Sequence, residues 1–163
     1  PKYTAMLAAE ILIKPSLIKS LIALKDPVVS NITYAAQRLK QHDITLLIEA
    51  INSKVDMPGF FIDTLEKAQR VISETQQSNV KIQFDIYHMQ IMQGDIIRTL
   101  EQNLSSIGHI QFADCPGRHE PGTGELNFNN IFKCLNDMCY EGWTSAEYKP
   151  KNDTLSSLHW LNH

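Results

Sequence analysis

Four polar side chains near the ends of short apolar segments are the residues that first suggest chemistry. They are Glu49, Asp85, Gln111 and Glu147. The intervals between them are 36, 26 and 36 residues, and each interval is about the length of one strand–helix repeat. In a parallel α/β sheet or barrel, repeats of that length bring strand ends to the same face, where such folds place their active sites. Four oxygen ligands meeting there, three of them carboxylates, suit a divalent ion such as Mg²⁺ or Mn²⁺.

The same four residues also allow a simpler interpretation. A single polar residue at the end of a strand is usually a solvated edge position. Four in register are harder to explain in this way, because carboxylates without partners in mostly apolar strands are costly to desolvate. From the spacing alone, a metal site and four separate solvated positions both remain open.

Two further side chains lie close to these positions in the sequence. His88 follows Asp85 by three residues, where we expect the start of a loop, and Arg118 lies in the Gly/Pro-rich segment CPGRHEPGTG at 115–124. Both allow a structural role, since a lone histidine is more often structural and the segment could be only a turn-dense connection. In a functional role, Arg118 would hold a substrate carboxylate through two parallel hydrogen bonds.

Strand-like and helix-like segments alternate from about residue 30, which predicts an α/β protein with a parallel sheet buried on both faces. Short apolar runs predict strands at 45–51, 81–85, 109–113 and 144–148. Helical spacing predicts helices at 31–42, 60–75, 95–104, from 127 to about 138, and 154–161. Asp95 and Asn127 are expected to cap two of these helices through their side-chain oxygens.

Residues 29–163 are expected to form one domain, because no long linker interrupts them. Residues 1–28 form an atypical segment in which Pro15 and Pro27 bound an apolar, lysine-containing stretch, interpreted as one or two short helices. The chain begins with Pro1 rather than Met, which suggests a fragment or an incomplete gene model.

Composition favours a soluble globular protein, with 43% hydrophobic and 20% charged residues among 163. The net charge of −3 gives no support to nucleic-acid binding, which normally needs a basic surplus. No apolar run reaches the roughly 18 residues that would predict a membrane span. The three cysteines form no CxxC motif, so reduced thiols in a cytoplasmic protein are expected.

Four long segments resemble one known family. They are LLIEAINS with MPGFF after it, QFDIYHMQIMQGD, GHIQFADCPGRHEPGTGE and EGWTSAEYKP. Together they resemble the hydroxypyruvate isomerases, which belong to the xylose isomerase-like TIM-barrel superfamily of sugar isomerases and epimerases. The resemblance covers about residues 30–160 and implies parallel βα repeats that form the C-terminal half of a TIM barrel, with about four strands. Residues 1–28 lie outside it, the first four βα units are absent, and the loop at 54–56 carries one residue more than usual.

The resemblance also implies roles for individual residues. Glu49 and Glu147 match the acid/base pair of related enzymes, and His88 and Arg118 match residues that contact substrate oxygens. Many members of the superfamily have histidine at the third metal-ligand position, whereas a glutamine matches the hydroxypyruvate branch. The metal ligands that the resemblance implies are Glu49, Asp85, Gln111 and Glu147.

The implied reaction is the reversible isomerisation of hydroxypyruvate and tartronate semialdehyde. A divalent ion, Mg²⁺ or Mn²⁺, would bind the carbonyl and neighbouring hydroxyl oxygens and stabilise an enediolate, while a glutamate transfers the proton. Two alternatives remain open. The first is an isomerase of the same family acting on 2-oxo-tetronate or another sugar acid. The second is an inactive truncated half-barrel that serves only for binding or assembly, because an open sheet leaves edges that favour a homo-oligomer.

Overall fold

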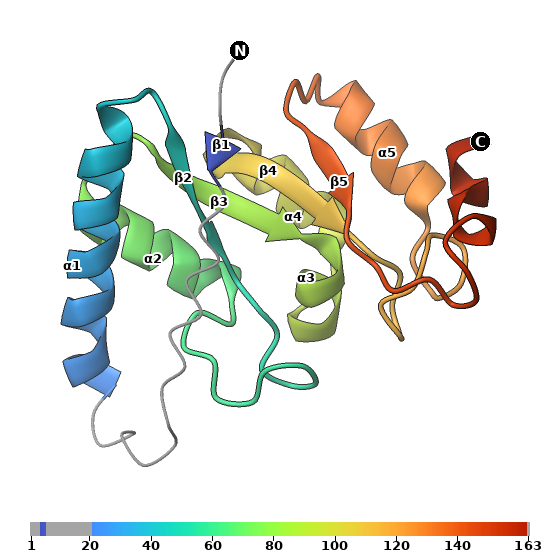
Figure 1. The fold of residues 1–163 in the computed structure, drawn as a ribbon, viewed down its shortest axis with the longest axis horizontal. Helices are drawn as coiled ribbons and strands as arrows, with labels where there is room; N and C mark the ends of the chain where they lie inside the picture. Colours follow the sequence, from blue (N-terminus) through green and yellow to red (C-terminus); the bar gives the residue numbers. More distant parts are fainter. Residues whose placement is uncertain (1–3, 6–20, 163) are drawn as a thin grey trace.

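The structure is a computed structural model that describes residues 4–5 and 21–162 of the chain. Five parallel strands form one sheet in the order β1-β2-β3-β4-β5 (Figure 1). Each βα repeat therefore adds its strand beside the preceding one, as in a TIM barrel. The expected fold class is confirmed, with β1 as an additional strand. The strands are β1 (Thr4–Ala5), β2 (Thr45–Glu49), β3 (Val80–Asp85), β4 (Ile107–Phe112) and β5 (Thr144–Ala146).

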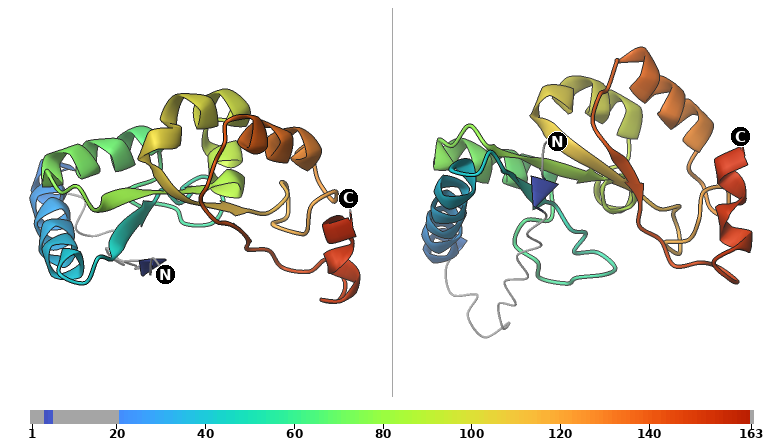
Figure 2. Two further views of the ribbon diagram at one scale, coloured as in Figure 1. Left: turned by 90° about the horizontal axis from the view of Figure 1, so that it is seen from above. Right: turned by 45° about the horizontal axis from the view of Figure 1, so that its top comes forward.

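Five α-helices follow the strands and cover one face of the sheet (Figure 2). Two short 3₁₀ helices, Leu104–Ser106 and Ser156–Asn162, complete the regular structure in the described ranges. The last of these lies where a closing helix was expected, at 154–161, and has 3₁₀ geometry. The α-helices are α1 (Leu21–Lys40), α2 (Leu65–Thr75), α3 (Ile86–Met92), α4 (Ile96–Asn103) and α5 (Phe128–Asp137).

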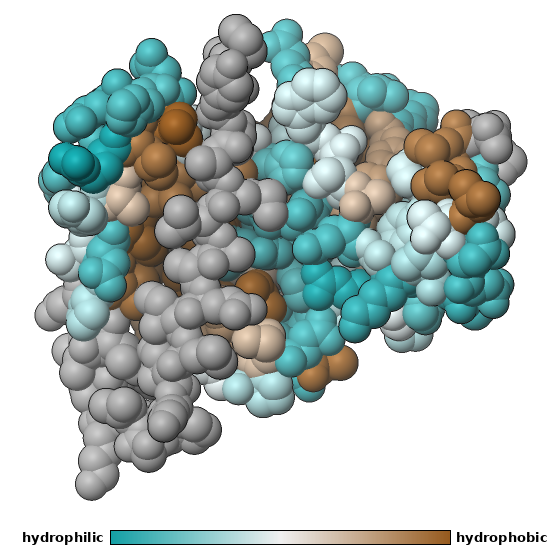
Figure 3. Space-filling view, viewed as in Figure 1, coloured by the Kyte–Doolittle hydropathy of each residue, from teal (hydrophilic) through white to brown (hydrophobic). Residues whose placement is uncertain are grey.

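Side chains alternate across the sheet, and this alternation separates the core from the polar face. Ile82 and Phe84 of β3 are buried in the core beneath the helices. Because successive side chains of a strand point to opposite faces, Gln83 and Asp85 lie on the other side. Hydrophilic residues gather across the middle of this other face, which Figure 3 shows in the orientation of Figure 1.

The register places the ends of the strands next to one another. Asp85 on β3 is paired with Gln111 on β4, and Glu49 on β2 is paired with Gln83. Glu147 follows directly after β5, and its backbone N–H donates to the Phe112 carbonyl at 2.9 Å. Each interval between successive polar residues therefore corresponds to one strand–helix repeat, as predicted.

After residue 60, two helix starts and one helix cap differ from the sequence predictions. Helix α2 begins at Leu65 rather than at residue 60, because the Thr64 side chain accepts a hydrogen bond from the Lys67 backbone and caps the helix there. Helix α3 was not predicted, so His88 lies in a helix instead of at the start of a loop. Asp95 precedes α4 in the left-handed conformation with φ 49°, and its side chain caps no described backbone group. Asn127 does cap α5, as expected.

The N-terminal region is described only in part. Helix α1 begins at Leu21, passes through Pro27 and continues to Lys40, so the expected boundary near residue 28 falls inside it. Thr4 and Ala5 pair in parallel with Thr45 and Leu46 of β2. The rest of the helices expected in residues 1–28, including the position of Pro15, lies outside the described residues. No helix in the described ranges is both long and apolar enough to cross a bilayer.

Burial of α4 predicts a large difference between two identical substitutions. Leu100 on α4 is fully buried, whereas Leu155 is 82% exposed. Leu100→Ala should lower the free energy of unfolding by about 2–5 kcal/mol, because it removes apolar contacts and leaves a cavity. Leu155→Ala should change it by less than about 0.5 kcal/mol. Urea denaturation followed by circular dichroism measures both, and equal effects would contradict the packing described here.

Candidate metal and substrate site

Glu49, Asp85 and His88 form a compact group at the end of the sheet. One potential ligand atom from each lies within 4.8 Å of the others. The His88 Nε2 atom is 3.7 Å from Glu49 Oε1 and 3.7 Å from Asp85 Oδ2. Asp85 and His88 are almost completely buried, and Glu49 is 15% exposed at its side chain. Sequence reasoning placed the two carboxylates together correctly, and the histidine joins them because α3 begins directly at the end of β3.

Asp85 connects this group to the backbone of α3. Its Oδ1 atom accepts hydrogen bonds from the backbone N–H groups of Tyr87 at 2.8 Å and His88 at 3.4 Å. These bonds satisfy N–H groups that have no partner inside the helix. They also fix the histidine ring near the carboxylates. The Oδ2 atom of Asp85 remains directed toward His88 and Arg118.

The orientation of His88 is set by Asn52. The Nδ1 atom of His88 accepts from the Asn52 backbone N–H at 3.4 Å and lies 2.7 Å from the Asn52 side-chain amide nitrogen. Since a backbone N–H can only donate, Nδ1 carries the lone pair and Nε2 carries the proton. Burial, followed by the charge of Arg118, lowers the pKa of His88 to about 4, so the ring is neutral at pH 7. The neutral ring directs an N–H donor toward Glu49 and Asp85.

The two buried carboxylates are under electrostatic strain. Burial, Asp85 and Glu147 raise the pKa of Glu49 to about 7. Burial also raises the pKa of Asp85 to about 6, with Arg118 opposing and Glu147 adding to the rise. The Oε1 atom of Glu49 is buried without a hydrogen-bond partner among the described residues. An unpartnered buried oxygen among like charges is a position that a bound cation would stabilise, so these residues fit a hard divalent ion.

Arg118 links the buried carboxylates to Glu147. Its guanidinium donates to Glu147 Oε2 at 2.5 Å and lies 3.8 Å from Asp85 Oδ2. It also lies over the Tyr87 ring, 5.2 Å from the ring centre, and 3.8 Å from Asp56 Oδ2. Burial alone would lower the pKa of Arg118, but the surrounding carboxylates outweigh it and raise this pKa above its ordinary value. The guanidinium is therefore a fixed positive charge at the rim of the site.

Gln111 and Glu147 lie at the end of the sheet but outside the compact group. Gln111 is buried beside Asp85, and its Oε1 accepts from the Gln83 side-chain amide at 2.5 Å. Glu147 is 48% exposed and is paired with Arg118. The structure thus brings the predicted residues to one edge of the sheet, while the ligand and substrate roles assigned to them stay predictions.

The loop after β2 contributes residues that sequence reasoning missed. Asp56 accepts from the Asn52 side-chain amide at 2.9 Å and from the Tyr87 hydroxyl at 3.3 Å. Burial and then Asp56 raise the pKa of Tyr87 to about 12, so this hydroxyl remains a donor. Lys54 donates to the carbonyls of Ile91 and Met92 at the end of α3, at 3.0 and 2.9 Å. The extra loop residue was the only sequence signal for these contacts.

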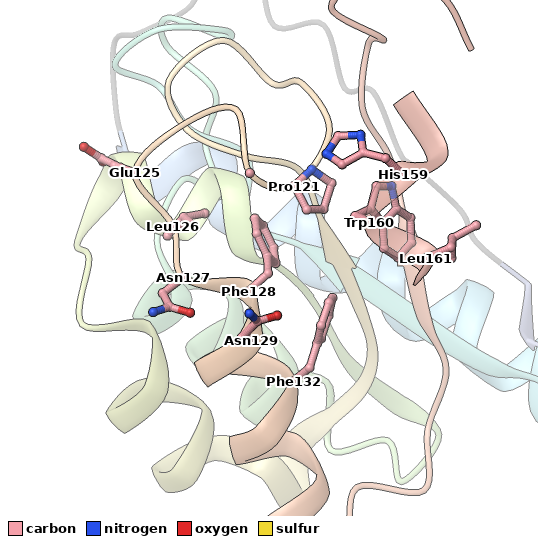
Figure 4. A pocket seen from close by; sticks show the side chains of 11 residues that line it. Pro121, Glu125, Leu126, Asn127, Phe128, Asn129, Phe132, His159, Trp160 and Leu161 are labelled. Carbon is pink, nitrogen blue, oxygen red and sulfur yellow. The ribbon is translucent and has the colours of Figure 1, made fainter. Parts of the chain in front are cut away.

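A separate groove of about 640 Å³ lies between the loop before α5, α5 itself and the last 3₁₀ helix (Figure 4). Phe128, Phe132 and Trp160 line it, together with Asn127 and His159. None of the predicted site residues lines this groove. The candidate site is therefore the edge of the sheet, not this cavity.

Comparison with known proteins assigns the chain to a family. Residues 21–163 match the family model described as xylose isomerase-like TIM barrel. The chain is 46% identical over 134 residues to the hydroxypyruvate isomerase of Escherichia coli, covering 82% of this chain and 52% of that protein. It is 41% identical over 131 residues to the 2-oxo-tetronate isomerase of Cupriavidus necator, covering 80% and 50%. The chain thus spans about half the length of the curated relatives it matches.

Solved structures support the same assignment. A crystal structure of an AP endonuclease, family 2, from Brucella melitensis aligns with a TM-score of 0.84 at 38% identity, covering 88% of this chain and 55% of that one. The 3-keto-D-glucoside 4-epimerase of E. coli aligns with a TM-score of 0.79 at 27% identity, covering 97% and 59%. These alignments agree with the parallel strand order and with the resemblance in the sequence. The chain belongs to the xylose isomerase-like TIM barrel family.

Proposed function

We propose that this chain carries the catalytic residues of a metal-dependent sugar-acid isomerase that interconverts hydroxypyruvate and tartronate semialdehyde. The observation that carries the proposal is the pair of neighbouring carboxylates of the buried Asp85 and the half-buried Glu49, with one buried oxygen of Glu49 lacking a partner among the described residues. The similarity to the E. coli hydroxypyruvate isomerase supports the choice of substrate.

A divalent ion, Mg²⁺ or Mn²⁺, is the cofactor in this proposal. When bound, it would supply Lewis-acid polarisation of the substrate's carbonyl and hydroxyl oxygens. The donor set is made only of carboxylate and amide oxygens, which such ions prefer. His88 is better suited to substrate contact than to metal binding, because its Nε2 atom carries the proton. The residues that would hold the ion are Glu49, Asp85, Gln111 and Glu147.

The protein's own groups then account for the proton transfer. The reaction moves a proton from the terminal CH₂OH carbon of hydroxypyruvate to the former carbonyl carbon, while the hydroxyl proton moves to the former carbonyl oxygen. Glu49 and Glu147 flank the site from β2 and from the end of β5, so one removes the carbon-bound proton and the same or the other returns it. The pKa of Glu49 near 7 suits a group that must both accept and release a proton at neutral pH.

Substrate orientation would come from Arg118 and His88. The planar guanidinium can bind the substrate carboxylate through two parallel hydrogen bonds, and the Tyr87 ring supports its face. The Nε2–H group of His88 can donate to a substrate oxygen. Holding both ends of a three-carbon acid in this way reduces the entropy that is lost in reaching the transition state.

A second candidate is a 2-oxo-tetronate isomerase. It is favoured by the 41% identity to the C. necator enzyme, which is close to the value for the hydroxypyruvate isomerase. The chemistry at Glu49 and Glu147 would be unchanged, and the longer acid would need more room around Arg118. Comparing turnover of the two substrates by the same preparation decides between them.

Turnover provides the direct test of the proposed reaction. Proton NMR of hydroxypyruvate in D₂O should show deuterium uptake or tartronate semialdehyde with Mg²⁺ or Mn²⁺, and neither with EDTA. Glu147→Gln should lower the rate by about 10²–10⁴-fold without changing the circular dichroism spectrum, because it removes an acid/base group. The exposed Glu141 offers a matched control, and Glu141→Gln should keep the wild-type rate.

Two results would count against this assignment. A Glu147→Gln variant that retains most of the wild-type rate would exclude Glu147 as an acid/base group. Absence of metal-dependent exchange with either substrate would favour the alternative that this chain alone is inactive and serves in binding or assembly.

Metal binding should release protons near neutral pH. Glu49, with its pKa near 7, is partly protonated at pH 6.5, and a carboxylate must lose its proton to bind a metal. The apparent affinity for Mn²⁺ should therefore weaken by up to about tenfold per pH unit below 7, and more steeply below 6 where Asp85 also protonates. Calorimetric titrations in buffers of different ionisation enthalpy measure the released protons. Proton uptake, or no proton exchange at pH 6.5, would contradict this.

Removal of the strained carboxylate should stabilise the metal-free chain at high pH. Because the folded-state pKa of Glu49 lies above its ordinary value of 4.5, the stability linked to this group is full below pH 4.5 and is lost as the pH rises through 7. In EDTA, Glu49→Gln should therefore gain stability relative to wild type between pH 4.5 and 8, by up to about 3 kcal/mol. Glu141→Gln is the control and should gain nothing, because Glu141 is exposed and is not among the groups that raise the pKa of Glu49. Thermal unfolding at several pH values measures the difference, and a gain that is independent of pH would contradict the assignment.

A further inference from the structure

Asp114 is a fully buried carboxylate just beyond the end of β4, and it is not among the residues to which a role has been assigned above. Its two oxygens accept four hydrogen bonds from backbone N–H groups. Oδ1 accepts from Cys115 at 2.8 Å and from Leu126 at 3.1 Å. Oδ2 accepts from Gly122 at 2.9 Å and from Gly124 at 2.8 Å. One side chain thus holds both ends of the loop at 115–126.

The backbone of Asp114 binds the middle of the same loop. Its N–H donates to the His119 carbonyl at 2.8 Å, and its carbonyl accepts from the Arg118 N–H at 3.1 Å. Arg118 adopts the left-handed conformation with φ 56°, which non-glycine residues adopt only when their surroundings hold them there. Side chain and backbone of Asp114 therefore fix the conformation from which Arg118 extends.

Gly124 allows the close approach that this arrangement needs. A Cβ atom at this position would lie 2.3 Å from the Cys115 carbonyl oxygen and 2.6 Å from Asp114 Oδ1. Both distances are far below van der Waals contact. A residue with a side chain would push the loop away from the carboxylate without altering the carboxylate itself.

The loop is also attached to the chain segment that follows β5. The Arg118 carbonyl accepts from the Lys149 N–H at 2.8 Å, and Glu120 Oε2 accepts from the Lys151 N–H at 2.9 Å. The segment that carries Glu147 and the loop that carries Arg118 are thus joined by two hydrogen bonds directly after the ion pair between them. The direction of the guanidinium depends on the loop that Asp114 holds.

We propose that Asp114 is a positioning residue that fixes the 115–126 loop so that the Arg118 guanidinium is held against Glu147 and Asp85. Asp114 acts through the backbone and does not itself contact substrate. A long arginine side chain loses less entropy on binding when its backbone is already fixed. The consequence for substrate binding rests on the function proposed above, whereas the effect on the order of Arg118 does not.

Asp114→Asn tests the proposal with little change in volume. The amide keeps one acceptor oxygen but presents an NH₂ group to two of the four N–H donors, so those bonds are lost. We expect a folded protein in which the amides of one pair, Gly122 with Gly124 or Cys115 with Leu126, exchange with solvent about tenfold or more faster. ¹⁵N relaxation of the Arg118 Nε–H group should show increased side-chain motion. Asp137→Asn, which alters an exposed partner of Lys133, is the matched control and should leave both signals unchanged.

Gly124→Ala is the second variant, and it keeps the experiment decisive if Asp114→Asn does not fold. It should produce the same increase in Arg118 motion, because its Cβ separates the loop from Asp114. An Arg118 Nε–H signal as ordered in the folded variants as in the wild type would overturn the proposal.

When the wild-type chain turns over hydroxypyruvate, steady-state kinetics distinguish a positioning role of Asp114 from a general structural role. Asp114→Asn should lower kcat/KM by about tenfold, chiefly through KM, and should cost nothing further in an Arg118→Ala background. An equal loss in both backgrounds would overturn the proposal. A wild-type chain without turnover bears on the proposed function only, because the relaxation measurement decides the role of Asp114 without it.

Discussion

The site depends on the carboxylate of Asp85, which has two structural roles. One oxygen caps α3, so that the helix begins at the residue after β3 without a connecting loop. The other oxygen faces His88 and Arg118. The cap fixes the first turn of the helix, so the side chain of His88, three residues after Asp85, lies close to Asp85. The ring of His88 therefore lies near the carboxylates of both Asp85 and Glu49. A carboxylate at a merely solvated strand end would be exposed to water and would have no need of such partners, whereas Asp85 is buried and has them.

Charge balance in the site follows from the same arrangement. Glu49, Asp85 and Glu147 place negative charges close together, and Arg118 supplies positive charge from the rim. The guanidinium reaches Asp85 only at 3.8 Å, and the Oε1 atom of Glu49 has no hydrogen-bond partner among the described residues. The raised pKa values of Glu49 and Asp85 are the physical consequence. In the proposed function, a bound cation would relieve the same repulsion that protonation relieves, so protons and the cation would compete for these carboxylates.

The sequence was informative wherever one strand face is buried, because alternation and repeat length then fix which side chains reach the edge of the sheet. That is how Glu49, Asp85, Gln111 and Glu147 could be placed together. Helix α3 escaped prediction because its first four residues, from Ile86 to Met89, are all buried, so the segment has no amphipathic pattern to detect. The contacts of Asn52 with His88 and with Asp56 depend on the path of the loop after β2, and no periodicity describes such a path. The same holds for Asp114, whose four partners are spread over twelve residues of loop.

Under the proposed function, this division between strands and loops separates proton transfer from the selection of the substrate. The carboxylates are supplied by strand ends, whose positions are set by the sheet register and the packed core. Arg118 is supplied by a loop, and its orientation depends on backbone hydrogen bonds to one buried side chain. The loop after β2 adds Asp56, a negative charge 3.8 Å from the guanidinium that would compete with a substrate carboxylate. In the proposed function, a change in either loop could therefore alter the length or charge of the acid that fits without moving Glu49 and Glu147, the groups proposed to transfer the proton. Under the proposed function, the preference between hydroxypyruvate and 2-oxo-tetronate should accordingly depend on these loops, and the proposed acid/base chemistry on the strand ends.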